Sequence, residues 1–334
     1  MAVLVNPASG RGRSGATGQM VADRLIARGD AVSVLAGDTA AHTGKLVGEA
    51  VATGTDVVVA VGGDGLIHLA VQHLAGTDTA LGIVPSGSGN DYARALGIPR
   101  RDSAAAIDLI ATTAPVALDL ARLDRPPRTG SGDTSDGGTG NETDSPPRWF
   151  AEVMSAGFDS RVNARANRMR FPRGGARYSA AVLAELGDTR GIDVTVSVDG
   201  VAHRHRAEMV TVGVTAYYGG GLAMLTGADP TDGQLDVLVV DELSPLRLLT
   251  LFPRVFTGSH LRLPVVHRYR GTRVAVTADR KVLSYADGEP FVTLPVSLSC
   301  VRGAVRVFCG KDPARGRVEV PDTLPNTLPD TPAD

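Results

Sequence analysis

One short stretch constrains the fold more than any other, an apolar run that ends in a cluster of glycines. The five residues 57–61 (VVVAV) are bounded by Asp56 on one side and by Gly-Gly-Asp-Gly at 62–65 on the other. An uninterrupted apolar run predicts a strand that is buried on both faces, as in a parallel sheet. The glycines allow a tight turn, and the apolar spacing at 66–74 predicts a helix directly after it.

The same stretch has the features of an anion-binding site, because backbone N–H groups and the positive end of a helix converge there. Asp64 is unusual in this place, since a bare carboxylate repels a phosphate. It is accommodated if a divalent cation lies between the two, or if the carboxylate accepts the proton of an attacking hydroxyl. The stretch therefore predicts a site of phosphoryl transfer.

Short apolar strands alternate with helical patterns in the first third of the chain. Strands are expected at 2–5, 31–35, 57–61 and 80–84. This alternation predicts a doubly wound α/β domain built on a parallel sheet. From residue 119 onward the pattern is mostly β, which predicts an antiparallel β-sandwich.

These patterns divide the chain into two domains. We expect an ATP-binding α/β domain over 1–118, completed by a returning strand at 303–310, and a β-sandwich domain over 119–302. Residues 125–148 are rich in Gly, Ser, Thr, Asp and Pro, which predicts a disordered insertion. The Pro- and charge-rich segment 311–334 predicts a flexible tail.

Composition limits the partners. A net charge of −2 gives no global field that would attract nucleic acid. Cys300 and Cys309 lack the spacing of metal ligands, which favours a reducing compartment. No apolar run reaches the ~18–20 residues that cross a bilayer, and Met1 leads directly into the first strand with no room for a signal peptide. We therefore expect a cytoplasmic protein with no nucleic-acid partner and no transmembrane segment.

Three glycine-rich loops follow successive strands of the expected sheet, at 6–15, 62–65 and 86–90. In a doubly wound topology the carboxyl ends of the strands meet at one edge, so we expect the loops to lie together. The first loop fits G-x-G-x-x-G, but four residues separate its glycines from the strand, which argues against a dinucleotide fingerprint. None of the loops contains a lysine, which excludes a P-loop.

In order and spacing, these motifs resemble those of the diacylglycerol kinase catalytic family, which includes sphingosine and ceramide kinases. The likeness covers the chain to about residue 310, apart from the insertion. The motifs that carry it are Asn6-Pro7-x-Ser9-Gly10, Gly62-Gly63-Asp64-Gly65, Gly87-Ser88-x-Asn90-Asp91, Gly157-Phe158-Asp159, the loop from Asp229 to Asp236, and Asp287-Gly288-Glu289.

The resemblance implies a nucleotide domain akin to those of phosphofructokinase and NAD kinase, a β-sandwich that holds a lipid, and ATP with Mg²⁺ between them. The chain departs from bacterial members at Leu66, where threonine is usual, and at Gly37, where the nearby Thr39 can substitute for a nucleotide-contacting threonine. The residues then expected to contact the nucleotide are Asn6, Pro7, Ala8, Ser9, Gly10, Thr39, Gly62, Gly63, Asp64, Gly65, Leu66, Ser88 and Asn90.

The loop at 229–236 has two readings. Asp232 on a tight turn, flanked by Asp229, Asp236 and free backbone carbonyls, offers oxygen ligands that suit Mg²⁺ or Ca²⁺. The same letters specify an Asp-Gly hairpin turn equally well, so the residues alone leave both open. The resemblance favours a structural metal held by Asp229, Asp232 and Gln234.

Two groups of basic side chains lie outside these motifs. Arg161, Arg165 and Arg168 share one helical face within a longer arginine run, which is either a solvated surface or a contact to an anionic bilayer. His203 and His205 share one face of a strand. With no third ligand in view, we expect them to be surface histidines.

We interpret the chain as an ATP-dependent lipid kinase that contacts the membrane peripherally and converts diacylglycerol into phosphatidic acid. Glu289 is expected to take the hydroxyl proton, Asp287 to orient it, and Asp64 to hold Mg²⁺ or to serve as the alternative base. Alternatives are a kinase of the same fold acting on a sphingoid base or on a soluble substrate such as NAD, and a non-catalytic lipid-binding regulator. A homodimer is left open.

Overall fold

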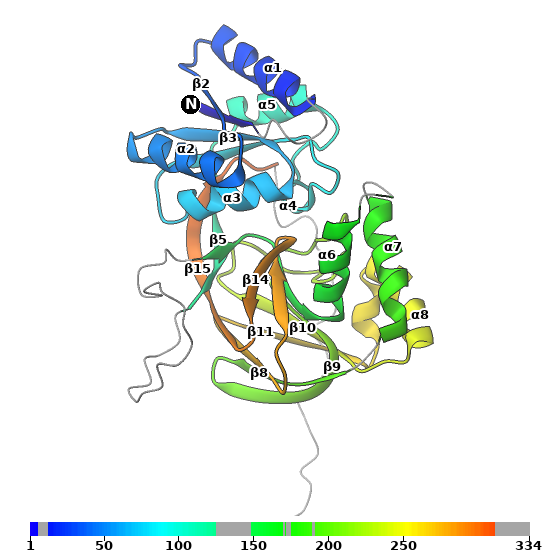
Figure 1. The fold of residues 1–334 in the computed structure, drawn as a ribbon. Helices are drawn as coiled ribbons and strands as arrows, with labels where there is room; N and C mark the ends of the chain where they lie inside the picture. Colours follow the sequence, from blue (N-terminus) through cyan, green and yellow to red (C-terminus); the bar gives the residue numbers. More distant parts are fainter. Residues whose placement is uncertain (6–12, 125–147, 170, 172–174, 189–190, 311–334) are drawn as a thin grey trace, which may run out of the picture.

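A parallel α/β region and a larger antiparallel β region share one continuous sheet in the computed structural model (Figure 1). The residues it describes are 1–5, 13–124, 148–169, 171, 175–188 and 191–310. The insertion predicted at 125–148, apart from Arg148, lies outside these ranges. So do the tail predicted at 311–334 and the predicted nucleotide contacts from Asn6 to Gly10.

Four parallel strands form the sheet of the first region, in the order β2-β1-β3-β4. They are β1 (Ala2–Val5), β2 (Ser33–Ala36), β3 (Val57–Gly62) and β4 (Ala80–Pro85). Every residue of β1, β3 and β4 is buried, as expected for strands covered on both faces.

Helices cover both faces of this sheet (Figure 1). They are α1 (Arg13–Ala27), α2 (Ala40–Ala52), α3 (Asp64–Leu74), α4 (Asp91–Ala95) and α5 (Ser103–Thr112). Helices α2 and α3 pack against each other, while Arg24 of α1 and Asp108 of α5 form an ion pair at 3.2 Å on the other face. The doubly wound α/β prediction is confirmed.

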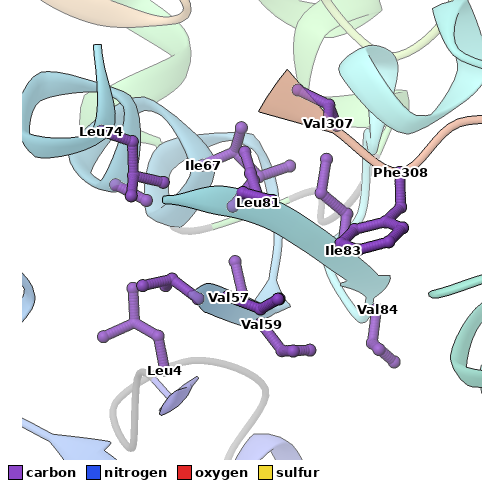
Figure 2. Close-up of a cluster of buried hydrophobic side chains, with 14 of the residues drawn as sticks. Leu4, Val57, Val59, Ile67, Leu74, Leu81, Ile83, Val84, Val307 and Phe308 are labelled. Atoms are coloured by element: carbon purple, nitrogen blue, oxygen red, sulfur yellow. The ribbon is translucent and has the colours of Figure 1, made fainter. Parts of the chain in front are cut away.

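Figure 2 shows the core between β3, β4 and α3, where Ile67 and Leu74 pack toward the valines and leucines of the strands. Full burial of an aliphatic side chain contributes about 1.5–3 kcal/mol. Because Ile67 and Leu74 are almost completely buried, they fix the helix against the sheet. The position of Asp64, the first residue of α3, is fixed with it.

The remaining strands are mainly antiparallel neighbours and curl around a second apolar core. They are β5 (Val116–Leu123), β6 (Trp149–Phe150), β7 (Val153–Gly157), β8 (Ile192–Val198), β9 (Val201–Gly213), β10 (Leu235–Asp241), β11 (Val266–Gly271), β12 (Arg273–Ala278), β13 (Leu283–Ala286), β14 (Glu289–Thr293) and β15 (Val296–Val307). The prediction of an antiparallel β region after the α/β region is confirmed.

Helices also cover the outer side of this second region, on the right in Figure 1. They are α6 (Phe158–Arg168), α7 (Gly175–Glu185) and α8 (Pro245–Val255), with short 3₁₀ helices η3 (Leu186–Asp188) and η4 (Ser259–Arg262). Among the helices of the described ranges, none combines the length and the apolar character that crossing a bilayer demands.

Strand β15 runs through both regions. It pairs antiparallel with β12 and β5, and its last residues then lie parallel to β4, with Arg306 opposite Ala80 and Val307 opposite Leu81. The register shifts between Val301 and Val305, where the strand passes from one region to the other. A single strand therefore connects the second region to the parallel sheet of the first region.

Candidate active site

The loops that follow β3 and β4 touch through their backbones. A Cβ atom on Gly87 would lie 2.5 Å from the Cα atom of Gly63, and one on Gly63 would lie 3.0 Å from the Cα atom of Gly87. Since a Cβ–carbon separation below 3 Å is a steric clash, the approach excludes any larger residue at Gly87. The prediction that these two glycine loops meet at one edge of the sheet is confirmed.

Asn90 gives the second loop its shape. It has a left-handed backbone with φ 53°, its side-chain oxygen accepts the Gly87 N–H at 3.0 Å, and its amide nitrogen donates to the Gly87 carbonyl at 2.9 Å. Both polar groups of Asn90 are thus used inside the loop, although the sequence analysis expects a nucleotide contact. Ser88, by contrast, is exposed and lines the cleft described below.

Two other expected nucleotide contacts have structural roles. The Leu66 side chain is buried in the first core and lies against Gly62, where an added Cβ would be 2.6 Å from Leu66 Cδ2. It is therefore not available for a side-chain contact with a nucleotide. Thr39 is exposed and caps α2, its hydroxyl accepting the His42 N–H at 3.1 Å.

A cleft of about 170 Å³ lies between the two regions, and its lining comes from both. Four carboxyl side chains line it: Asp64, Asp91, Glu152 and Asp287. The other polar side chains of the lining are Ser88, Asn163, Asn167, Arg177, Tyr178 and Tyr218. A single arginine among four carboxyl groups leaves the cleft with an excess of negative charge.

Burial and mutual repulsion shift the carboxyl groups of the cleft toward their protonated forms. Burial, together with the Asp91 carboxylate, raises the pKa of Asp64 to about 6. The pKa of Glu152 is raised well above its ordinary range by complete burial and by the charges of Asp64 and Asp287. The pKa of Asp64 therefore lies close to neutral pH, where the charge of its carboxyl group can change.

Asp91 links the second glycine loop to the β region. One of its carboxylate oxygens accepts the Gly220 N–H at 2.6 Å, and the other lies 3.5 Å from Arg94 Nε. Burial raises the pKa of Asp91, against the lowering effect of these two partners. The oxygen near Arg94 is buried and makes no hydrogen bond to any described residue.

Asp287 and Gly288 form the two-residue turn between β13 and β14, with φ values of 50° and 83°. Positive φ at both positions is typical of a type I′ hairpin turn. The Asp287 carboxylate is buried and accepts four hydrogen bonds, from His68 Nδ1 and from the backbone N–H groups of Ala151, Glu152 and Val153, at 2.9–3.3 Å.

These bonds explain why the apolar stretch 149–157 does not form one continuous strand. The N–H groups of Ala151 and Glu152 point to Asp287 instead of continuing a ladder, so the structure has two strands, β6 and β7, with a break between them. His68 belongs to α3, so Asp287 also ties the two regions together. Burial lowers the pKa of His68, but the hydrogen bond and charge of Asp287 outweigh it and the pKa is raised.

Glu289, the predicted base, is exposed at the start of β14. Its carboxylate lies beside the N-terminus of α3, where a Cβ atom on Gly65 would be 3.6 Å from Glu289 Oε1. It is not among the residues that line the cleft. The structure thus places Glu289 next to the glycine loop that follows β3, at the margin of the four carboxyl side chains that line the cleft.

The far wall of the cleft is held by a buried acid. Asp159 accepts hydrogen bonds from the hydroxyl of Tyr178 and from Asn163. Burial raises its pKa, opposed by hydrogen bonds that include those of Tyr178 and Tyr218. Asp159 therefore positions the lining side chains on α6 and α7, and is itself enclosed.

Comparisons with known proteins agree with this architecture. Residues 1–123 match the diacylglycerol kinase catalytic domain, and residues 152–309 match the YegS C-terminal NAD kinase beta sandwich-like domain. A protein named diacylglycerol kinase from Mycobacterium tuberculosis is 39% identical over 311 residues, which cover 91% of this chain and 93% of the relative. The chain belongs to the diacylglycerol kinase family.

Two further comparisons support the assignment. A protein named "Probable lipid kinase YegS-like" from Stenotrophomonas maltophilia is 29% identical over 271 residues, or 79% of this chain and 82% of the relative. A crystal structure of a diacylglycerol kinase from Bacillus anthracis shares the fold, with a TM-score of 0.66 at 18% identity over 93% of this chain and 96% of that one. Membership of the diacylglycerol kinase family implies a lipid kinase that uses ATP.

Within this diacylglycerol kinase family chain, the loop at 229–236 is held by protein donors. Asp229 accepts the Thr231 N–H and hydroxyl at 3.0 and 2.6 Å. Asp232 accepts the Gln234 N–H at 2.9 Å and pairs with Arg270. These contacts are those of a closed turn, and a structural metal at the loop stays a prediction.

The arginine run is partly neutralised inside the protein. Arg161 lies 3.6 Å from Glu185 and 3.4 Å from Glu208, and Arg165 pairs with Glu185. Two of the three arginines on this face are therefore paired with glutamates, and a contact of the face with an anionic bilayer stays a prediction. Arg177, further along the run, lines the cleft.

Sequence reasoning did not select Glu152, His68 or Arg177 as site residues. Glu152 carried a usable signal, because a glutamate inside the apolar stretch from Trp149 to Met154 is unlike a solvated acid. Nothing in the local sequence marked His68 or Arg177 as a site residue. Their roles depend on Asp287 and on the packing of α7, both far away along the chain.

Proposed function

We propose that this diacylglycerol kinase family member transfers the γ-phosphoryl group of ATP to the free hydroxyl of diacylglycerol, with phosphatidic acid as the product. The observation that carries the proposal is the cleft between the two regions, where four carboxyl groups lie beside two touching glycine loops. The name of the 39% identical relative from Mycobacterium tuberculosis supports the choice of acceptor.

The nucleotide phosphates have suitable partners at the edge of the first sheet. The start of α3 presents backbone N–H groups and the positive end of its dipole. Ser88 adds a hydroxyl, and Arg177 adds a positive charge from the opposite wall. Because Gly63 and Gly87 carry no side chains, a phosphate can approach the backbone of both loops.

Asp64 and Asp91 fit a divalent cation. Burial raises the pKa of both carboxyl groups, and the charge of Asp91 raises that of Asp64 further, so an added cation would stabilise their ionised forms. The buried Asp91 oxygen without a hydrogen bond among the described residues is a further candidate ligand. We assign these two residues to Mg²⁺, which would neutralise charge on the transferred phosphoryl group.

We keep Glu289 as the proposed base. Its carboxylate is exposed next to α3, so an incoming hydroxyl can reach it. Asp287 accepts four hydrogen bonds from the protein and fixes the turn that precedes Glu289, which makes it a positioning residue. Asp64 is the alternative base, because a carboxyl group with a pKa of about 6 suits proton transfer near neutral pH.

Helix α8 offers a route to a lipid surface, in a peripheral contact. Leu248, Leu251 and Val255 face the core, whereas Leu246 in the helix and Phe256 directly after it are 72% and 48% exposed. An exposed apolar helix face of this kind is typical of segments that lie in the membrane interface. We prefer this face to the arginine face of α6, where Arg161 and Arg165 pair with glutamates.

An acceptor panel tests the function. The full chain is incubated with γ-labelled ATP and Mg²⁺ against vesicles that contain diacylglycerol, vesicles that contain a sphingoid base, and NAD in solution. We expect label in phosphatidic acid. Label on the sphingoid base or on NAD alone would replace the acceptor, and no label on any of the three would contradict a catalytic role and favour the lipid-binding regulator.

A further inference from the structure

Three side chains that offer metal ligands meet on neighbouring strands of the second region. His205 is on β9, Asp241 is the last residue of β10, and His267 is on β11. Strand β10 pairs with both of the others. One ligand atom from each residue lies within 4.8 Å of the other two.

The sequence analysis expects His205 to be a surface histidine, since no third ligand is in view along the chain. The structure overturns this, because Asp241 and His267 are contributed by other strands. His267 is opposite Val239 in the β10–β11 register, and Asp241 lies two residues further along β10, on the same face. The irregular pairing of β9 and β10 at Val240 and Asp241 brings that carboxylate toward His205.

The three ligand atoms converge at short range. The Asp241 carboxylate lies 3.5 Å from His205 Nδ1 and 2.8 Å from His267 Nε2. The two imidazole rings are 4.7 Å apart at their centres. The His205 side chain is only 10% exposed, whereas those of His267 and Asp241 are about one-third exposed, so the cluster opens to solvent on one side.

Tyr269 sets the orientation of His205. Its hydroxyl lies 2.8 Å from His205 Nε2, and its ring stacks on His203 at 4.1 Å. A histidine that binds a metal through Nδ1 carries its proton on Nε2, where a hydrogen-bond acceptor holds the tautomer.

We propose that His205, Asp241 and His267 form a binding site for a divalent transition metal of the Zn²⁺ class, through Nδ1, a carboxylate oxygen and Nε2 respectively. Two imidazole nitrogens and one carboxylate oxygen are the donor set of open zinc sites, with solvent as a further ligand. Mg²⁺ and Ca²⁺ prefer oxygen ligands. This site shares no residue with the proposed Mg²⁺ and nucleotide site and does not rest on it.

The bound ion is expected to stabilise the fold. A bound ion would join three adjacent strands, of which β11 pairs with β10 alone among the described strands. Because the ion binds the folded chain through residues from three strands, it should raise the melting temperature as its concentration rises.

Calorimetric titration of ZnCl₂ into the untagged, EDTA-treated full chain, without nucleotide, tests the proposal. We expect one equivalent to bind, with no competition from Mg²⁺. The single variants His205→Gln and His267→Gln should lose this binding, and Tyr269→Phe should weaken it by roughly 10–100-fold. His42→Gln is the matched control, since His42 lies 3.9 Å from Asp38 and belongs to no three-ligand cluster in the described chain.

Melting curves in EDTA check that each variant is folded. If His205→Gln does not fold, His267 on strand β11, whose side chain is about one-third exposed, still provides a test. Co²⁺ adds a second readout, because ligand-field absorption should appear with the wild type and be lost with His267→Gln. No Zn²⁺ binding by the wild type, or unchanged binding by the His205→Gln/His267→Gln double variant, would overturn the proposal.

Discussion

The carboxyl groups of the cleft differ in their surroundings, and the difference separates their roles. Asp287 accepts four hydrogen bonds and serves to position the β13–β14 turn. Glu152 is buried, and burial together with the charges of Asp64 and Asp287 raises its pKa. Asp64, at the start of α3 and beside Asp91, has a pKa of about 6, so its charge changes near neutral pH. Carboxyl groups at neighbouring positions of one cleft therefore differ in their hydrogen bonds and in their pKa.

The first residue-scale prediction concerns pH. The raised pKa of Asp64 means that its ionised form, which binds cations and accepts protons, is lost as the pH falls through about 6. We expect kcat/KM to fall about tenfold per pH unit below that value. Initial rates measured across this range test it, with Asp56→Asn, at the far end of β3, as the control. A profile that stays flat well below this pH would show that Asp64 does not control the reaction.

The second concerns the base. Glu289→Gln is nearly isosteric and exposed, so it should leave the melting temperature unchanged while kcat falls by ~10²–10⁴. Asp287→Asn should instead lower the melting temperature, because hydrogen bonds to a charged group contribute about 1.5–3 kcal/mol each. If Glu289→Gln retains the wild-type kcat, the base is elsewhere and Asp64 becomes the candidate.

At the scale of elements, the spacing of apolar residues predicted strands and helices well where the local sequence alone decides which side chains are buried. The apolar run at 57–61 became β3, and the helix after the glycines begins at Asp64. The break between β6 and β7 was not predictable, because it depends on Asp287, 135 residues away from Glu152. Likewise, the sequence suggests that Asn90 contacts the nucleotide. Only the folded loop shows that the side-chain amide of Asn90 makes its hydrogen bonds to the backbone of Gly87.

The exposed face of α8 gives an element-scale prediction. Replacing Leu246, Leu249 and Phe256 with serine removes three exposed apolar side chains, each worth up to about 1.5–3 kcal/mol if it enters a bilayer. We expect at least a tenfold loss of binding to anionic vesicles in co-sedimentation, with no loss of kcat on detergent-dispersed substrate. Val34→Ser, at an equally exposed apolar position on β2, is the control. Unchanged vesicle binding would exclude α8 as the contact.

For the whole molecule, the site depends on two regions brought together by β15 and by the His68–Asp287 pair. The sequence pattern predicted both regions. A meeting of ATP and lipid between them is implied by the family resemblance and stays a prediction. The sequence pattern could not predict which side chains complete the cleft, because Glu152 and Arg177 reach it only through tertiary packing. The same holds for the cluster of His205, Asp241 and His267, whose members come from three strands.

A deletion tests whether the 125–148 insertion contributes to folding or activity. The Leu123 N–H donates to the Arg148 carbonyl at 2.9 Å, so the two ends of the 125–148 insertion are adjacent. Removing residues 126–147 and closing with a short turn should change the melting temperature by no more than about 2 °C and leave turnover intact. Thermal melts and the kinase assay measure both. A collapse of either would show that the insertion is structural.

The central claim is that phosphoryl transfer to diacylglycerol takes place at the carboxylate cleft. The most direct test is the rate of phosphatidic acid formation from ATP, Mg²⁺ and diacylglycerol by the wild type, Asp64→Asn and Asp56→Asn. Asp64→Asn should lower kcat by ~10²–10⁴ and raise the melting temperature of the ligand-free protein, since it removes a buried charge that its neighbours repel. Asp56→Asn should match the wild type. Wild-type protein that forms no phosphatidic acid, or a folded Asp64→Asn variant that forms it at the wild-type rate, would contradict the claim.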